Sequence, residues 1–237
     1  MVPWAPHLGG NMETTFAKLK SFLVRLKWLA FALVIVIVEQ SALLLVKKGQ
    51  ALWQTLLLAL LMLVISGVTY WIAKKVNLVG GKTLSQKDSK WLWIGLGTLA
   101  LFVIKMIGGI ILIIEKGPNA STANQTILEE AGLHPLLLLV LVVVLAPIME
   151  EIVFRGLLFG KLFGPKSIIG LFLSSFLFGL FHGPTDIGSW VIYGGMGLML
   201  GFVYYRTEKL SYTMSIHFLN NAIAAIFLLI AMFLKLK

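Results

Sequence analysis

The stretch LLLLVLVVVLAPIMEEIVFRGLLF, residues 136–159, decides the fold because it is apolar for most of its length. A helix that spans a bilayer needs about 20 predominantly apolar residues, and this stretch is long enough. Glu150, Glu151 and Arg155 interrupt it. A charged side chain near the centre of a spanning helix costs about 3 kcal/mol on insertion scales, so these residues indicate internal partners or a functional site.

The composition extends this interpretation to the whole chain. Of the 237 residues, 59% are hydrophobic and 13% are charged, and the mean hydropathy is +0.94, which excludes a soluble protein. We predict an all-α, polytopic transmembrane helical bundle of about seven spans, with an eighth span or a re-entrant segment as the alternative. The predicted spans are Leu29–Val46, Leu52–Ala73, Trp91–Ile114, Pro135–Phe159, Ser167–His182, Ser189–Tyr205 and Thr213–Leu234.

The distribution of charge predicts the orientation of the chain. The 20 Lys and Arg residues outnumber the 10 Asp and Glu residues, and they gather in loops on one side of the predicted spans rather than in a continuous stripe. This pattern predicts a cytoplasmic amino terminus and argues against a nucleic-acid partner. We divide the chain into a basic cytoplasmic segment (1–28), a region of three spans (29–134) and a region that holds the remaining spans and the polar residues (135–237). The absence of cysteine excludes disulfides and a cysteine nucleophile.

Spacing on the 136–159 helix separates the roles of its charged residues. Glu151 and Arg155 are four residues apart, share a helix face and suit an ion pair. Glu150 lies about 100° around the helix from Glu151, so the same arginine does not serve both carboxylates. Glu150 is therefore the carboxylate left for chemistry. Pro147 has no N–H for the carbonyl one turn earlier, which predicts a kink or a local widening just before the acidic pair.

Two later spans carry further polar pairs at one-turn spacing. Phe178 and His182 share a face in the sequence FGLFH, and His217 and Asn221 share a face in HFLNN. An imidazole and an amide on one face can donate two hydrogen bonds toward a common point, as a developing oxyanion requires. We expect the three helices to enclose one polar site.

Two chemical schemes remain open for these residues. In the first, a water molecule lies between Glu150 and His182, and Glu150 acts as the general base for attack on a peptide carbonyl. His217 and Asn221 then stabilise the tetrahedral oxyanion. In the second scheme, Glu150, His182 and His217 bind a divalent metal such as zinc, which activates the water. The residue types alone do not separate the two schemes.

Three motifs in this order resemble a known family. EEIVFR fits an EExxxR motif, FGLFH an FxxxH motif and HFLNN an HxxxN motif of the CPBP family of intramembrane proteases. The resemblance covers Pro135 to Ala225. This family includes CAAX prenyl endopeptidases and bacterial bacteriocin-processing and self-immunity proteins, also called Abi proteins.

The resemblance implies a role for each motif residue. The implied catalytic residues are Glu150, His182, His217 and Asn221. The implied supporting residues are Glu151, Arg155 and Phe178. In the family, the first glutamate and the FxxxH histidine activate water, and the later histidine and asparagine form the oxyanion site. We favour this glutamate mechanism, with no metal or other cofactor. If a metal such as zinc is bound, its expected ligands are Glu150, His182 and His217.

The expected function is that of an intramembrane endopeptidase in a bacterial plasma membrane, with its site open toward the cytoplasm. The expected partners are a peptide or protein substrate and membrane lipids, and the oligomeric state is left open. Maturation of bacteriocin or pheromone peptides and self-immunity are the expected settings. The alternatives are a non-catalytic immunity or regulatory binding protein and a transporter that relays protons.

A shared site requires its residues to lie at a similar depth in the bilayer. Straight spans would place Glu150, His182 and His217 at different depths. We therefore expect the helix that carries His182 to tilt or to begin deeper than Ser167, or residues 160–166 to re-enter the membrane. We also expect His182 to lie next to Glu150.

Other unusual residues have simpler interpretations. Lys105, inside the third span, is expected to pair with an acid such as Glu39 or to extend to an interface, and the alternative is contact with a substrate carboxylate. Gly197 and Gly201 form a small-xxx-small pair, which predicts close helix packing. Asp186, in a short loop, is expected to be solvated.

Overall fold

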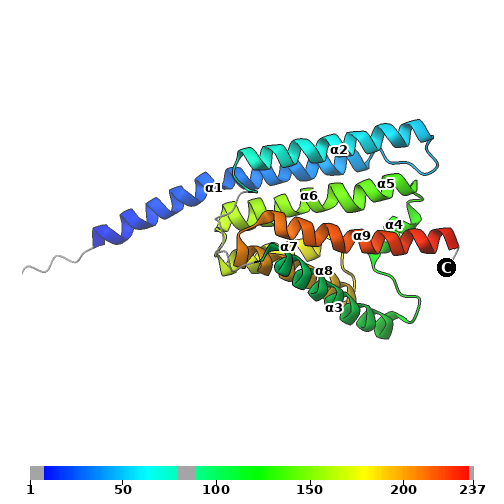
Figure 1. Ribbon diagram of the computed structural model, residues 1–237. Coiled ribbons are helices and arrows are strands. Elements are labelled where there is room, and N and C mark those ends of the chain that lie inside the picture. The colour runs from blue at the N-terminus through cyan, green and yellow to red at the C-terminus, as the bar shows by residue number, and fades with distance from the viewer. Residues whose placement is uncertain (1–7, 80–88, 235–237) are drawn as a thin grey trace, which may run out of the picture.

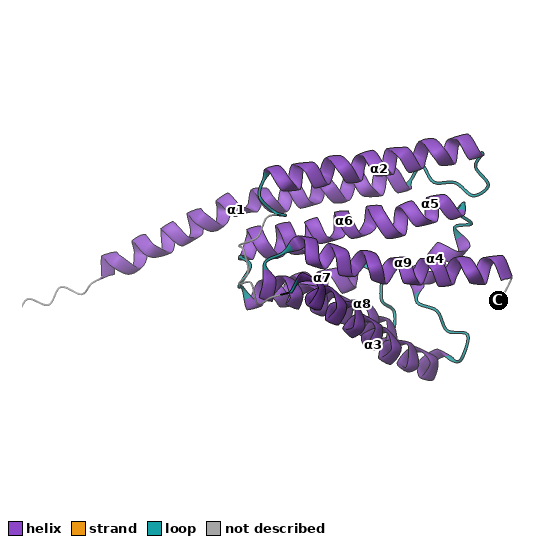
Figure 2. Ribbon diagram, in the orientation of Figure 1, coloured by secondary structure: helices purple, strands orange, loops and turns teal. Residues whose placement is uncertain are grey.

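The computed structural model describes residues 8–79 and 89–234, and it is built of helices, as predicted (Figures 1 and 2). The helices are α1 (Leu8–Leu43), α2 (Leu52–Lys75), α3 (Lys90–Lys116), α4 (Ala123–Glu130), α5 (Pro135–Leu139), η1 (Val140–Leu145), α6 (Ala146–Glu150), η2 (Glu151–Phe163), α7 (Ile168–Phe181), α8 (Ile187–Thr207) and α9 (Leu210–Leu234). The segments α5, η1, α6 and η2 follow one another without a break and form a single long helix, Pro135–Phe163.

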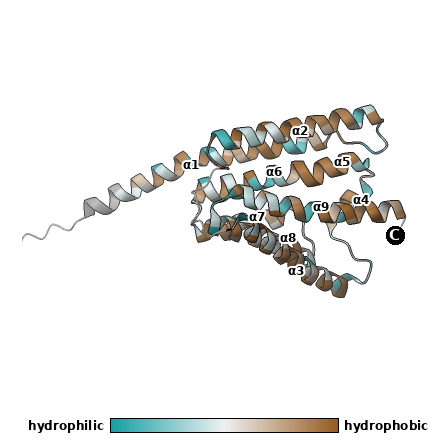
Figure 3. Ribbon diagram, viewed as in Figure 1, coloured by the Kyte–Doolittle hydropathy of each residue, from teal (hydrophilic) through white to brown (hydrophobic). Residues whose placement is uncertain are grey.

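In the described part of the chain, six helices are long and apolar enough to cross a membrane. The protein is therefore a multi-pass membrane protein. The helix Pro135–Phe163 is the most buried of the six, and the others expose many large apolar side chains. Hydrophobic residues recur along all of these helices (Figure 3). α1 runs through residue 28 without interruption, so the basic segment and the first span are parts of one helix. The start of α1 projects beyond the other helices (Figure 1).

The fifth predicted span is a shorter apolar helix, α7. Its 14 residues extend roughly 21 Å, less than the roughly 30 Å of a hydrocarbon core. His182 caps its carboxyl-terminal end. Because the helix stops early, this histidine lies at the end of the helix inside the protein rather than at the membrane edge.

Asp186 has a structural role, contrary to the expectation that it is merely solvated. Its carboxylate accepts a hydrogen bond from the Ser189 N–H at 2.6 Å, which caps the start of α8, and it pairs with Lys116 at 2.6 Å. Partial burial opposes ionisation, but the hydrogen bonds from Lys116 and Ser189 outweigh it and hold the pKa of Asp186 below its ordinary value. The ion pair fixes the start of α8 to the end of α3.

The helix widens before the acidic pair, as Pro147 predicted. Residues Val140–Leu145 are π-helical, and the Ala146 N–H donates to the Leu141 carbonyl five residues earlier. In that register the donor for the Val142 carbonyl would be residue 147, which is proline and has no N–H. The Val142 carbonyl is therefore free to accept a hydrogen bond from another helix.

The boundaries of two helices explain how Glu150 and His182 come to lie at the same depth in the bilayer. The long helix continues to Phe163 rather than ending at Phe159, so Glu150 lies roughly 20 Å from the end of that helix. α7 begins at Ile168 with Ser167 as its cap, and His182 lies roughly 21 Å from this start. The two residues therefore reach the same depth, and no deeper start of α7 is needed.

The last helix starts deep in the bundle, which brings His217 to the same level. A Cβ atom added at Gly156 would lie 3.5 Å from the Leu210 side chain, so the first residue of α9 packs beside Gly156. Gly156 is seven residues from the end of η2, and His217 is seven residues into α9. Each interval spans roughly 10 Å, so His217 also lies roughly 20 Å deep.

Close packing of α7 and α8 confirms the prediction for Gly197 and Gly201. A Cβ added at Gly197 would lie 2.6 Å from the Ser175 carbonyl oxygen, and one added at Gly201 would lie 2.8 Å from Leu171. The Gly197 carbonyl also accepts a hydrogen bond from the Ser175 hydroxyl at 2.9 Å. A side chain at position 197 would force the two helices apart.

Replacing Gly197 with Ala is therefore expected to destabilise the protein by about 1–3 kcal/mol, the usual cost of overpacking. Gly109→Ala is the matched control, because a Cβ there meets nothing within 4 Å and alanine favours a helix. Thermal unfolding in detergent measures both. Equal midpoints for the two variants would contradict the close contact.

Candidate functional site

Glu150 is the last residue of α6 and lies at the centre of the site. The residue is 8% exposed. Its Oε2 atom lies 3.8 Å from Nε2 of His182 and 3.9 Å from Nε2 of His217. It has no hydrogen-bond partner within the described residues. The structure thus confirms that His182 lies next to Glu150, and it brings His217 to the same oxygen.

The backbone fixes the orientation of the His182 ring. Its Nδ1 atom lies 2.9 Å from the Phe178 carbonyl oxygen, and a carbonyl only accepts, so Nδ1 carries the hydrogen. In the neutral ring Nε2 then presents a lone pair toward Glu150. The Phe178 ring packs against His182 at a centroid distance of 4.7 Å. The one-turn spacing of the FxxxH motif thus positions the histidine through both the backbone and the side chain of Phe178.

Tyr193 also holds His182, and the sequence analysis did not single it out. The two rings stack with centroids 4.5 Å apart and planes 17° from parallel. The Tyr193 hydroxyl is itself held by Thr122 at 2.9 Å and Asn124 at 3.4 Å. No spacing pattern on α8 marks this tyrosine, because its contact depends on how α4, α7 and α8 pack.

A buried ion pair anchors the long helix. Arg155 donates to Glu151 at 2.8 Å, and both side chains are fully buried, which confirms the predicted i,i+4 pair. Arg155 also donates to the Gly197 carbonyl at 3.0 Å, and its guanidinium lies 4.3 Å from the centre of the Phe178 ring. This one side chain therefore connects η2, α7 and α8.

Glu151 also orients His217. The Nδ1 atom of His217 lies 3.0 Å from the Glu151 carboxylate, which only accepts, so Nδ1 carries a hydrogen. The Nε2 atom then points toward Glu150. The second glutamate of the EExxxR motif thus supports the site by holding both Arg155 and His217.

Asn221 lines the cavity at the site, and its amide is firmly held. Its Nδ2 atom donates to the Val142 carbonyl at 2.9 Å, the carbonyl that Pro147 leaves without a backbone donor. Its Oδ1 atom accepts from Asn220 at 2.8 Å. Asn220 lies on a different face by spacing and was assigned no role, yet it fixes the direction of the Asn221 amide. The second hydrogen on Nδ2 of Asn221 has no acceptor in the described part of the chain, and it is available to a ligand.

A cavity of about 330 Å³ adjoins these residues. Its lining residues are Glu39, Gln40, Leu43, Asn124, Leu128, Leu141, Val142, Ala146, Glu150, Phe181, His182 and Asn221. It lies on the side of the site where α1 ends and α5 begins, because Leu43 is the last residue of α1 and Leu141 is near the start of the long helix. This end of the bundle is opposite the amino terminus of α1. If the amino terminus is cytoplasmic, the cavity faces the other side of the membrane, so the two expectations are not compatible.

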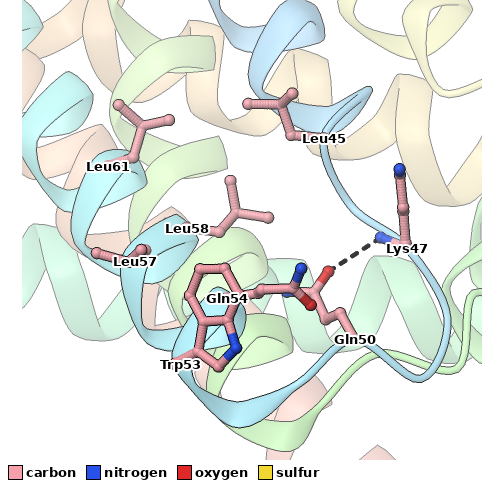
Figure 4. Close-up of a pocket in the computed structure, with 8 residues that line it drawn as sticks. All are labelled: Leu45, Lys47, Gln50, Trp53, Gln54, Leu57, Leu58 and Leu61. Carbon is pink, nitrogen blue, oxygen red and sulfur yellow. Dashed lines mark hydrogen bonds between the residues drawn. The ribbon is translucent and has the colours of Figure 1, made fainter.

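A second hollow, of about 350 Å³, lies at the turn between α1 and α2 (Figure 4). The backbone N–H of Lys47 donates to Gln50 there at 3.0 Å, and the other lining side chains are mainly Trp53 and leucines. Its lining includes no carboxylate or imidazole. This hollow therefore offers neither of the group types on which the candidate chemistry depends.

The donors at Glu150 match zinc in type but not in spacing. A tetrahedral zinc ion with ligand bonds of about 2.1 Å has ligand atoms about 3.4 Å apart. The Glu150 oxygen is 3.8 and 3.9 Å from the two histidine nitrogens. In residues 8–79 and 89–234, no group of three or more His, Asp or Glu is arranged to hold a metal ion. We therefore derive no step through a metal.

Lys105 does not pair with Glu39, which was one of the arrangements expected for it. It lines a separate pocket of about 290 Å³ with Asn220, between α3 and α9. Within the described residues, no ion pair joins it to an acid. Lys105 and Glu39 therefore face different cavities.

The fold and the site define the class of protein. It is a multi-pass membrane protein in which a buried glutamate faces two histidines from other helices. Residues 132–223 match the family described as type II CAAX prenyl endopeptidase Rce1-like. The matched region contains every candidate site residue predicted from the motifs, and the match supports the resemblance to the CPBP family of membrane proteases.

Three curated bacterial proteins are similar to the chain. UPF0177 protein YvdC of Lactococcus lactis is 32% identical over 70% of this chain and 62% of its own length. Membrane-embedded CAAX protease MroQ of Staphylococcus aureus is 30% identical over 58% of each chain. Putative membrane peptidase YdiL of Bacillus subtilis is 33% identical over 60% of this chain and 59% of its own. The alignments thus span about three fifths of these relatives, and no solved structure is significantly similar.

Proposed function

We propose that this protein is an intramembrane endopeptidase in which Glu150 and His182 activate water. The observation that carries the proposal is the buried Glu150 oxygen, with one histidine nitrogen at 3.8 Å and another at 3.9 Å, beside a cavity. General bases act within hydrogen-bond reach of the proton that they remove. An oxygen atom bound beside these three groups is within reach of all of them.

The first step is attack on the peptide carbonyl. Glu150 accepts one proton of the water, and the Nε2 lone pair of His182 accepts a hydrogen bond from the other. The water oxygen forms a bond to the carbonyl carbon, and the carbonyl oxygen takes the negative charge. The low polarity around Glu150 strengthens these interactions, because water does not compete for them.

The oxyanion site uses His217 and Asn221. His217 keeps a hydrogen on Nδ1 for Glu151, so its Nε2 atom donates to the oxyanion when the ring carries both hydrogens. Asn221 offers the second hydrogen of its amide nitrogen. When the tetrahedral intermediate collapses, protonated Glu150 returns its proton to the leaving amine, and the C–N bond breaks.

The substrate class follows from the place of the site. The cavity lies between the spanning helices α1, Pro135–Phe163 and α9 and the shorter helices α4 and α7, so the substrate is a short peptide or a membrane-associated segment in extended form. It enters from the end of the bundle opposite the amino terminus of α1. This supports processing of exported peptides such as bacteriocins or pheromones, or self-immunity, in the bacterial plasma membrane.

Cleavage of a quenched fluorescent peptide library by purified protein in detergent tests this proposal. Cleavage by wild type, lost in His182→Ala, supports it. Binding without cleavage would support the non-catalytic immunity or regulatory alternative instead. Flux driven by a pH gradient in vesicles would support a transporter.

Removal of divalent metals is expected to leave the activity unchanged, because the Glu150 and histidine donors are too far apart for a tetrahedral ion. The measurement is the cleavage rate before and after dialysis against EDTA, with zinc added back. His182→Ala, expected to lose about 100-fold or more, shows that the assay reports this site. Loss with EDTA and recovery with zinc would assign Glu150, His182 and His217 as metal ligands.

A further inference from the structure

A second carboxylate lies in the candidate catalytic cavity, on a helix outside the three motifs. Glu39 belongs to α1 and follows the apolar run ALVIVIV. It is only 5% exposed, and it lines the same cavity as Glu150 and His182. The packing of α1 against η2 brings it there, although it is more than a hundred residues from Glu150 in sequence.

The Glu39 carboxylate has no partner among the residues that the structure describes. No hydrogen bond or ion pair joins its side chain to them. Lys105 lines a different pocket and does not neutralise it. An ionisable group inside a membrane protein normally faces a partner or a functional cavity, because burial without either is costly.

The other lining side chains make the cavity attractive to a cation. Gln40, Asn124 and Asn221 are uncharged, and Glu150 carries a second carboxylate. The lining contains neither lysine nor arginine. Opposite charges attract strongly in a medium of low polarity, and like charges repel equally strongly. A substrate carboxylate placed here is therefore disfavoured, whereas an ammonium or guanidinium group is favoured.

We propose that Glu39 is a specificity-determining residue that binds a cationic group of the peptide substrate close to the bond to be cleaved. The group is the side chain of lysine or arginine or a free amino terminus. The inference rests on the proposed peptidase function and adds the chemical class of substrate to it. Glu39 contacts the substrate through this group and takes no part in the proton transfers.

The test uses the full-length protein in detergent and peptides that differ at one position, with lysine, norleucine or glutamate placed in turn on either side of the cleaved bond. A second set compares free with acetylated amino termini and so separates the two sources of positive charge. Wild type is expected to prefer the cationic member of a set by about 10-fold or more in kcat/KM.

Three variants make the test specific to the charge. Glu39→Gln is expected to abolish the preference for the cationic peptide over the norleucine peptide, and an unfolding midpoint close to that of wild type shows that the variant is folded. Glu39→Lys is expected to invert the preference in favour of glutamate. Gln40→Ala, at a neighbouring position that lines the same cavity, is expected to keep the wild-type preference.

Binding separates this inference from the peptidase proposal. The lysine and norleucine peptides are titrated by fluorescence anisotropy onto Glu150→Gln protein, with and without Glu39→Gln. Tighter binding of the lysine peptide that depends on Glu39 supports the inference even if no peptide is cleaved. Equal binding of both peptides by Glu150→Gln protein, or a lysine preference that survives Glu39→Gln, overturns it.

Discussion

Glu150→Gln is expected to lower kcat/KM for peptide cleavage by about 100-fold to 10,000-fold, the contribution of a positioned general base. The amide is nearly the same size as the carboxyl group but does not accept a proton from water at neutral pH. Because Oε2 has no hydrogen-bond partner within the described residues, the substitution breaks no hydrogen bond of this atom, and the fold is expected to be retained. The measurement is steady-state cleavage of a library-derived peptide, with thermal unfolding as the fold check.

Glu130→Gln is the matched control for this prediction, because Glu130 is exposed at the end of α4. It makes the same chemical change outside the site and is expected to leave the rate unchanged. A Glu150→Gln protein that cleaves at the wild-type rate would remove Glu150 from the reaction. Such a result would contradict the proposed mechanism, in which Glu150 acts beside His182 and His217.

Arg155→Met is expected to lower the free energy of unfolding by about 3–5 kcal/mol, because it leaves the Glu151 carboxylate buried without its cation. The same change removes the hydrogen bond to Gly197 and the contact with the Phe178 ring. Chemical or thermal unfolding in detergent measures the loss. Arg206→Met, at an exposed position near the end of α8, is the control and is expected to have little effect.

A second substitution distinguishes charge from packing in this prediction. Glu151→Gln combined with Arg155→Met removes both charges, so part of the lost stability is expected to return. Activity is not expected to return, because His217 then loses the carboxylate that orients it. A double variant that is less stable than Arg155→Met alone would show that the pair acts mainly through packing.

The geometry of the candidate site depends on supporting residues that orient the two histidines and Asn221. Arg155, Glu151, Phe178 and Tyr193 fix the two histidines, and Asn220 fixes Asn221. Buried polar networks of this kind are costly when one member is left unsatisfied. Substitutions in these supporting residues are therefore expected to affect stability and activity together, whereas Glu150→Gln separates the two.

Much of the architecture was predictable from the sequence. Long apolar runs predict spanning helices, because backbone polar groups in lipid must be satisfied within a helix. One-turn spacing was sufficient to predict the Glu151–Arg155 pair and the partnership of Phe178 with His182. Pro147 predicted the local widening, because it lacks an N–H, and the motifs predicted the family. These features depend on neighbours in sequence, so the sequence alone determined them.

The tertiary structure decided which side chains from different helices come together. The depth of His182 and His217 depends on where η2 ends and where α9 begins, and these boundaries are set by contacts such as that of Gly156 with Leu210. Tyr193 and Glu39 belong to no motif, because the site residues that they approach lie on other helices. Pairing with Glu39 was one expectation for Lys105, yet packing turns the two side chains into different cavities. Local spacing determines which face of a helix a side chain occupies, but only the packing of helices decides what that face meets.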